Sequence, residues 1–148
     1  MSLDLLIGTF KSESRFKKRS QIYVIKIPDA FKEYFSEDFY VIPINEVIFG
    51  VNFFYFLVLD KKEYDAKEKD EKDFKEKFSG GFTVKGGDRI EFPIQCIQEK
   101  YRNLNNAFYF LGCGDHIEIW LGLEYEKYLN FIKTHSELIN QTLISFNF

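Results

Sequence analysis

The sequence predicts an α+β fold, in which strands form most of the core and short helices join them. Aromatic side chains make up 19% of the 148 residues and hydrophobic side chains 45%, a composition typical of a packed globular protein. Apolar and alternating runs of strand length recur between Gly, Pro and Asn residues. Helical spacing of apolar residues extends furthest after Glu124. A chain of this length fits one domain or two small halves that share a core.

The first half consists mainly of predicted strands. Residues 5–10 begin an apolar strand, and the β-branched run 22–27 predicts a second one. Pro28 then opens a short helix, in which aromatic residues follow at helical spacing. Aromatic and β-branched side chains dominate residues 39–59 and predict two or three largely buried strands. The mixed charges of residues 60–77 predict a solvent-facing helix.

Residues 84–93 (VKGGDRIEFP) form the stretch around which the chain is organised. The adjacent glycines supply the positive φ angles of a tight hairpin, and apolar and charged residues then alternate as in a strand. Pro93 suits the first turn of a helix. The stretch therefore predicts a strand, a turn, a strand and a helix start, and the turn carries the cations Lys85 and Arg89.

The second half continues with a predicted helix from Pro93 to about Arg102. Residues 107–111 and 116–120 have strand patterns and are separated by turn-forming residues, so we predict a second hairpin there. A long amphipathic helix follows from Glu124.

Charge is unevenly distributed along the chain. The net charge of −3 gives no global attraction to nucleic acid, so any such binding needs a local patch. Residues 11–32 supply that patch, because seven cations there face only Glu13 and Asp29. The cations of this basic tract are Lys11, Arg15, Lys17, Lys18, Arg19, Lys26 and Lys32.

The two halves share an order of elements, which indicates an internal duplication. Each has a strand, a charged turn ending in Arg, a strand, a Pro-initiated helix, two strands and a Glu-Tyr pair. The matching positions are Arg19 and Arg89, Pro28 and Pro93, Leu59 and Trp120, Glu63 and Glu124, and Tyr64 and Tyr125. We divide the chain into a first half (1–60), a charged helical connector (61–79), a second half (80–130) and a C-terminal helical tail (131–148).

Several segments resemble the MraZ family of bacterial transcriptional regulators, which belongs with the SpoVT-AbrB type of DNA-binding domain. Residues 6–10 (LIGTF) resemble the opening strand of the family, and residues 28–35 (PDAFKEYF) and 89–93 (RIEFP) resemble its two Pro-led helices. The most specific segment is 112–120 (GCGDHIEIW), which a Glu-Tyr pair follows. Together these segments cover most of the chain in the order of the family.

In that family, the loop of each half that approaches DNA carries an Asp, three residues and an Arg. The pattern falls on Arg15 to Arg19 in the first half and on Lys85 to Arg89 in the second. Both arginines match, whereas both aspartates are replaced by cations. The first half also has about five additional residues between its Arg and Pro28. The replacements remove negative charge from the loops, which favours contact with phosphate.

The resemblance implies two tandem swapped-hairpin halves, the double-split β-barrel of AbrB-like domains, with short helices and a longer C-terminal helix. It also implies a ring-shaped homo-oligomer that binds double-stranded DNA at tandem promoter repeats upstream of division and cell-wall genes. Arg19 and Arg89 are the candidates for reading guanine edges, as forked guanidinium groups can. The candidates for phosphate contact are Arg15, Lys17, Lys18 and Lys85.

Two other classes of function compete with DNA binding. The replaced aspartates and the longer first loop favour, as an alternative, a ring-forming structural or protein-interaction module that has lost selective DNA binding. An enzyme is the weakest hypothesis, because the sequence has no P-loop, dinucleotide fingerprint or nucleophile elbow. We expect His116 to be a hydrogen-bonded structural residue and His135 to lie on the surface of the last helix.

The remaining expectations concern ligands and location. Cys96 and Cys113 lack a paired spacing with each other or with the histidines, so we expect thiols that are at least partly buried, no disulfide and no metal site. We expect no cofactor and no small-molecule substrate. No apolar run reaches the length of a membrane span and no signal-peptide pattern is present, which favours the cytoplasm and, by the resemblance, the nucleoid.

Overall fold

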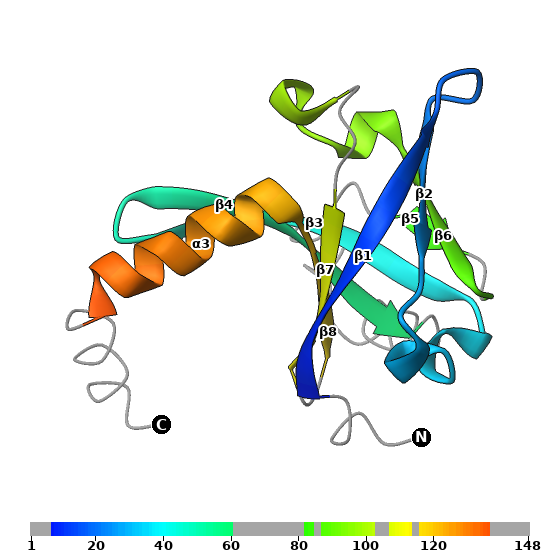
Figure 1. The fold of residues 1–148 in the computed structure, drawn as a ribbon, viewed down its shortest axis with the longest axis horizontal. Coiled ribbons are helices and arrows are strands. Elements are labelled where there is room, and N and C mark those ends of the chain that lie inside the picture. The colour runs from blue at the N-terminus through cyan, green and yellow to red at the C-terminus, as the bar shows by residue number, and fades with distance from the viewer. Residues whose placement is uncertain (1–6, 61–81, 85–86, 103–106, 114–115, 137–148) are drawn as a thin grey trace, which may run out of the picture.

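The computed structural model describes residues 7–60, 82–84, 87–102, 107–113 and 116–136. Most of these residues form one antiparallel sheet that is followed by an α-helix, which confirms the coarse α+β class (Figure 1). The elements are β1 (Ile7–Lys17), β2 (Ile22–Lys26), β3 (Phe39–Ile48), β4 (Val51–Asp60), β5 (Phe82–Val84), β6 (Arg89–Pro93), β7 (Ala107–Cys113), β8 (Ile117–Leu121) and α3 (Gly122–Thr134). Across the sheet the strands follow the order β5-β3-β4-β8-β7-β1-β2-β6.

Most of the predicted strands are present. Residues 39–59 form two long strands that pair with each other along their whole length, and β7 and β8 form the predicted second hairpin. β1 extends further than predicted, because the polar residues after Phe10 continue the strand and pair first with β7 and then with β2. The predicted connector (61–79) and the tail beyond residue 136 lie outside the described residues.

The sheet curls so strongly that its two ends approach each other. Phe56 of β4 and Phe92 of β6 have ring centroids 4.9 Å apart, although four strands separate them in the sheet order. The edge strands β5 and β6 are joined by only four residues, 85–88. The fold is therefore barrel-like, in agreement with the coarse part of the predicted fold.

The predicted hairpin at 84–93 is wrong in its pairing. Within the described part of the chain, β5 pairs only with β3 and β6 pairs only with β2. The connection is held by other backbone partners: Gly87 N donates to Phe35 O at 2.9 Å, and Ile27 N donates to Asp88 O at 2.9 Å. The strand, turn and strand follow one another as predicted, but the turn crosses from one edge of the sheet to the other.

The predicted helix from Pro93 to Arg102 is also wrong. Two 3₁₀ turns, Ile94–Cys96 and Glu99–Tyr101, take its place, and Ile97 between them is extended with φ −100° and ψ 132°. An extended Ile97 lets its side chain enter the core, where it is 1% exposed. The helix predicted after Pro28 is likewise replaced by two short 3₁₀ turns, which bury Phe31 and Phe35.

Aromatic rings fill the interior of the curled sheet. Phe31 stacks on Phe110 at 6.1 Å between ring centroids, and Phe35 meets Phe39 edge-on at 4.4 Å. All four side chains are at most 1% exposed. Full burial of such side chains is worth about 1.5–3 kcal/mol each, so this cluster stabilises the barrel-like body.

A second cluster lies on the other face of the sheet, beneath α3. Phe53, Trp120 and Phe131 form its buried centre. Figure 1 shows α3 lying along the β3–β4 hairpin, on the side of the molecule away from the tip of β1 and β2. The amphipathic helix predicted from Glu124 is therefore present, and its apolar side covers this cluster.

Glu124 fixes the start of α3. Its carboxylate is 1% exposed and accepts hydrogen bonds from Phe54 N at 3.1 Å, Tyr101 Oη at 2.8 Å and Lys127 Nζ at 3.2 Å. Burial and the bond to Glu124 raise the pKa of Tyr101 to about 12. A buried carboxylate is stabilised when its oxygens are hydrogen-bonded and when it lies in the first turn of a helix. Glu124 thus joins α3 to β4 and to the segment before β7.

Gly122, the first residue of α3, gives a test of this packing. A Cβ at this position would lie 2.9 Å from the backbone oxygen of Ala107, closer than side chains normally approach. We expect Gly122→Ala to lower the free energy of unfolding by about 1–3 kcal/mol, although alanine has the higher helix propensity. Urea unfolding measures the change. Leu123→Ala, at an exposed neighbour, is the control with an expected effect within about 0.5 kcal/mol. A Gly122→Ala protein as stable as the wild type would contradict the proposed close contact.

Candidate nucleic-acid interface

The hairpin of β1 and β2 brings together four of the six candidate DNA-binding residues. Arg15 pairs with Val24 and Lys17 with Ile22, so both cations lie on β1 near the hairpin tip. Strand alternation directs Phe16 the other way, where its ring packs on Tyr23 at 4.9 Å. Arg15 and Lys17 are therefore exposed on one face while the residue between them anchors the strand.

Lys18 and Arg19 lie in the turn that joins the two strands, and backbone contacts hold this turn in place. Gln21 Nε2 donates to Lys18 O at 2.7 Å and closes the turn. Gln21 O accepts a hydrogen bond from Ile94 N at 2.9 Å, which ties the turn to the segment after β6. Both cations are exposed. Lys18 and Arg19 are therefore exposed on a turn that hydrogen bonds hold in place.

The residues of the hairpin itself carry only positive charge near its tip, and the nearest acidic residue of β6, Glu91, pairs with Val24. From Ser14 to Ile27 the sequence holds five cations and no Asp or Glu. Arg15, Lys17, Lys18 and Arg19 form no ion pair with any residue that the structure describes. Figure 1 shows the tip, in blue at the upper right, projecting past the neighbouring strands. Such a group of exposed cations can bind an anionic surface.

Arg89 is not part of this group. It opens β6 opposite Lys26, whereas Pro93 at the end of β6 pairs with Ile22 beside the tip. The two ends of this ladder are four residues apart, or roughly 13 Å at about 3.3 Å per residue. The structure therefore separates Arg89 from Arg19. Lys85, the remaining candidate, lies outside the described residues.

The surroundings of Arg89 carry mixed charges. Lys26, its neighbour on β2, lines a shallow pocket of about 230 Å³. The residues around the pocket are Lys11, Ser12, Lys26, Ile27, Pro28 and Asp29. Asp29 forms an ion pair with Lys32 at 3.0 Å, and the hydrogen bond from Lys32 lowers the pKa of Asp29. The cations at this end are therefore partly compensated, unlike those at the hairpin tip.

The structure also groups residues that the sequence analysis did not combine. His116 is hydrogen-bonded, as expected, and its partner is Glu118 at 2.8 Å. Cys113 lies beside them on the same hairpin. Both cysteines are thiols, but Cys113 is exposed because it ends β7 at the hairpin turn, whereas Cys96 is half-buried. In the sequence, the spacing Cys-x-x-His-x-Glu across a predicted turn is the pattern that indicates this grouping of side chains.

Comparisons with known proteins do not place the chain in a family. No protein-family model matches the sequence, and no curated protein matches it either. Within the described ranges, no helix is long and apolar enough to cross a membrane.

The turn at the hairpin tip gives a test of its conformation. Gln21 has a left-handed backbone with φ 55°. Gln21→Ala and Gln21→Gly both remove the side-chain bond to Lys18, but only glycine relieves the left-handed strain. We expect Gln21→Gly to be more stable than Gln21→Ala by about 1 kcal/mol in urea unfolding. Ser20 in the same turn, whose φ is not positive, is the matched control, and there alanine should be at least as stable as glycine. Equal stability of the two Gln21 variants would contradict this turn geometry.

Proposed function

We propose that the protein binds double-stranded DNA through the tip of its β1–β2 hairpin and acts as a sequence-selective transcriptional regulator of the MraZ type. The observation that carries the proposal is the group of exposed cations on this tip: Arg15, Lys17, Lys18 and Arg19. Phosphate contacts supply most of the affinity of DNA-binding proteins. A local positive group can therefore bind DNA even though the chain as a whole is acidic.

The shape of the tip fits the same target. The major groove admits a two-stranded β-ribbon, and the end of the β1–β2 hairpin is such a ribbon. Arg19, in the turn, is the candidate for a bidentate contact to guanine, while the lysines beside it contact phosphates. Because Gln21 ties the turn to Ile94, little conformational freedom is lost when the turn docks.

The strand register supports the duplicated, swapped-hairpin part of the proposal. When the two halves are aligned at Pro28 and Pro93, Val24 is equivalent to Arg89 and Lys26 to Glu91. If each residue is replaced by its equivalent in the other half, the observed pair Val24↔Glu91 becomes the observed pair Lys26↔Arg89, and the pair Ile25↔Ile90 is unchanged. A two-fold relation between the halves requires this behaviour.

The ladder between β4 and β8 follows the same rule. When the halves are aligned at Leu59 and Trp120, the same replacement turns the pair Phe56↔Ile119 into the pair Val58↔Ile117. It leaves the pair Leu57↔Glu118 unchanged. Each of the two ladders is thus compatible with a two-fold relation between the halves. This agreement supports the resemblance to swapped-hairpin domains, in which equivalent halves share one barrel.

We infer different roles for the two candidate arginines from the strand register. Arg89 corresponds to Val24 of the first half, not to Arg19, because the first hairpin is longer. The proposal therefore places DNA contact mainly on the first hairpin and gives Arg89 a separate, weaker contact. Self-association into a ring, which the resemblance implies, would present many copies of one tip to tandem repeats and raise the effective affinity.

The alternative is an interaction module that has lost selective DNA binding. The separation of Arg89 from the hairpin tip favours it, because the two candidate arginines then do not belong to one continuous group of cations. Exposed apolar side chains at the opposite end of the molecule also favour it: Val47, Phe49, Leu123 and Leu129 are all at least 46% exposed. Binding of the wild-type protein to tandem promoter repeats in excess competitor DNA distinguishes the two, because an interaction module should show none.

A pair of matched charge reversals tests the interface. Lys18→Glu changes the hairpin tip, and Lys133→Glu makes the same change at an exposed position of α3. We expect Lys18→Glu to weaken binding to a labelled duplex and to flatten the plot of log K against log salt by about 0.9 for each phosphate that is no longer neutralised. Fluorescence anisotropy between about 50 and 200 mM salt measures both quantities. Equal effects of the two substitutions would show that only overall charge matters, and would reject the hairpin as the interface.

Sequence selectivity is tested at Arg19. On the preferred DNA sequence, selected from genomic fragments, we expect Arg19→Ala to cost about 1–3 kcal/mol of binding free energy, and on unrelated DNA much less. Arg19→Lys keeps the charge but removes the guanidinium fork, so it should lose the preference and retain most non-specific binding. If Arg19→Lys binds the preferred sequence as well as the wild type does, Arg19 contacts phosphate and does not read a base.

A further inference from the structure

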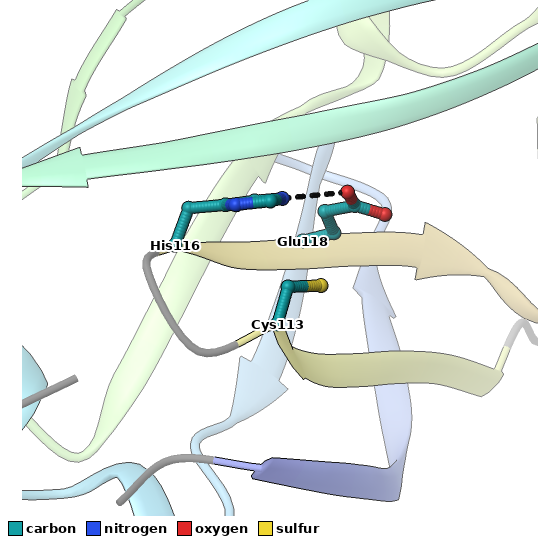
Figure 2. A group of neighbouring side chains, drawn as sticks. All are labelled: Cys113, His116 and Glu118. Atoms are coloured by element: carbon teal, nitrogen blue, oxygen red, sulfur yellow. Dashed lines mark hydrogen bonds and ion pairs between the residues drawn. The ribbon is translucent and has the colours of Figure 1, made fainter. Parts of the chain in front are cut away.

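The β7–β8 hairpin places a thiol, an imidazole and a carboxylate on one face. Cys113 ends β7, and its backbone N donates to His116 O at 2.9 Å across the turn. Glu118 pairs with Leu111, two residues before Cys113, so the alternation of both strands directs all three side chains to the same side. Figure 2 shows the three side chains pointing to that side of the hairpin.

The distances between the three groups suit a metal ion. One ligand atom from each of Cys113, His116 and Glu118 lies within 4.8 Å of the others. Zinc bonds of about 2.0–2.3 Å in a tetrahedron separate ligand atoms by about 3.3–3.8 Å. Small rotations of the side chains therefore bring the three atoms to ligand positions. The 2.8 Å hydrogen bond between His116 Nε2 and Glu118 Oε2 must open by roughly 0.5–1 Å to reach that separation.

Trp120 holds Glu118 in a suitable orientation. Its indole Nε1 donates to Glu118 Oε1 at 2.9 Å and leaves Oε2 directed at His116. Trp120 is itself 4% exposed, and Tyr55 stacks on it at 4.8 Å with an interplanar angle of 10°. Metal-ligating carboxylates commonly receive such a second hydrogen bond, which fixes their orientation. Glu118 is thus partly preorganised, with a side chain 18% exposed.

The face remains open to solvent where a metal would enter. Cys113 is exposed, and the side chain of His116 is 29% exposed. Three protein ligands leave a fourth position that water can occupy. A mixture of sulfur, nitrogen and oxygen donors is typical of zinc and of the neighbouring divalent transition metals, and not of calcium or magnesium.

We propose that Cys113, His116 and Glu118 form a binding site for a divalent transition metal of the zinc class. On binding, the Cys113 thiol releases its proton to solvent and the thiolate sulfur forms the bond to the metal. His116 binds as the neutral imidazole, and Glu118 exchanges its contact with His116 for one with the metal. The site joins the end of β7 to the start of β8, at a distance from the cationic tip of β1 and β2, and does not depend on DNA binding.

Titration of the reduced, metal-free full-length chain with Co²⁺ tests the proposal. Co²⁺ reports its ligands by absorption, since a thiolate ligand gives a charge-transfer band and tetrahedral geometry gives intense d–d bands. We expect both at one Co²⁺ per chain, and their loss when Zn²⁺ displaces Co²⁺. Cys113→Ser should remove the charge-transfer band. Cys96→Ser is the matched control and should retain it, because Cys96 is half-buried and outside the cluster.

Two further variants separate ligation from folding. Glu118→Gln keeps an oxygen that can accept from Trp120 but loses the anionic ligand, so Co²⁺ affinity should fall at least tenfold while the circular dichroism spectrum of the apoprotein stays unchanged. Trp120→Phe tests the positioning bond and should weaken Co²⁺ binding by about 10- to 100-fold with the bands retained at saturation. The proposal is overturned if the wild type gives no thiolate band, if Cys113→Ser gives the same band, or if folded Glu118→Gln binds as tightly as the wild type.

Discussion

Two strand ladders, β2 with β6 and β4 with β8, are the constraint on which the rest of the structure depends. Together with the pairings of β1 with β7 and of β3 with β5, they join the first half of the chain to the second. In the first ladder, the paired residues Ile25 and Ile90 are both fully buried. A shift of one residue would turn these side chains to the outer face, so the core itself specifies the register. The position of every loop, including the cationic tip, follows from it.

The positions of the strands along the chain could be predicted from the sequence much better than the pairing of the strands with one another. Alternation and β-branched runs indicated the strands, because these patterns report which face of a strand is buried. They do not report which strand lies alongside, so β5 and β6 were expected to pair and instead form the two edges of the sheet. The helix predicted from Pro93 was wrong for a related reason. Ile97 and Tyr101 are four residues apart, as on one face of an α-helix, but an extended Ile97 followed by a short 3₁₀ turn also accommodates this spacing.

The candidate sites show the same limit. The cations of the hairpin tip are neighbours along the chain, so the sequence alone could group four of them. Whether Arg89 lies near Arg19 depends on register across β2 and β6, which no local pattern contains. For Cys113, His116 and Glu118 the local pattern was sufficient, because a predicted hairpin with strand alternation already places them on one side. Paired Cys and His spacings alone do not indicate this group, because its third member, Glu118, is a carboxylate.

The position of Trp120 has one more consequence. It is the only tryptophan in the chain, it is almost fully buried, and it meets rings from both β4 and α3, namely Tyr55 at 4.8 Å and Tyr128 at 5.0 Å. The tryptophan fluorescence of the protein therefore originates where α3 packs on the sheet. Because the indole would meet solvent if α3 separated from β8, its emission wavelength reports the docking of the helix in an unlabelled molecule.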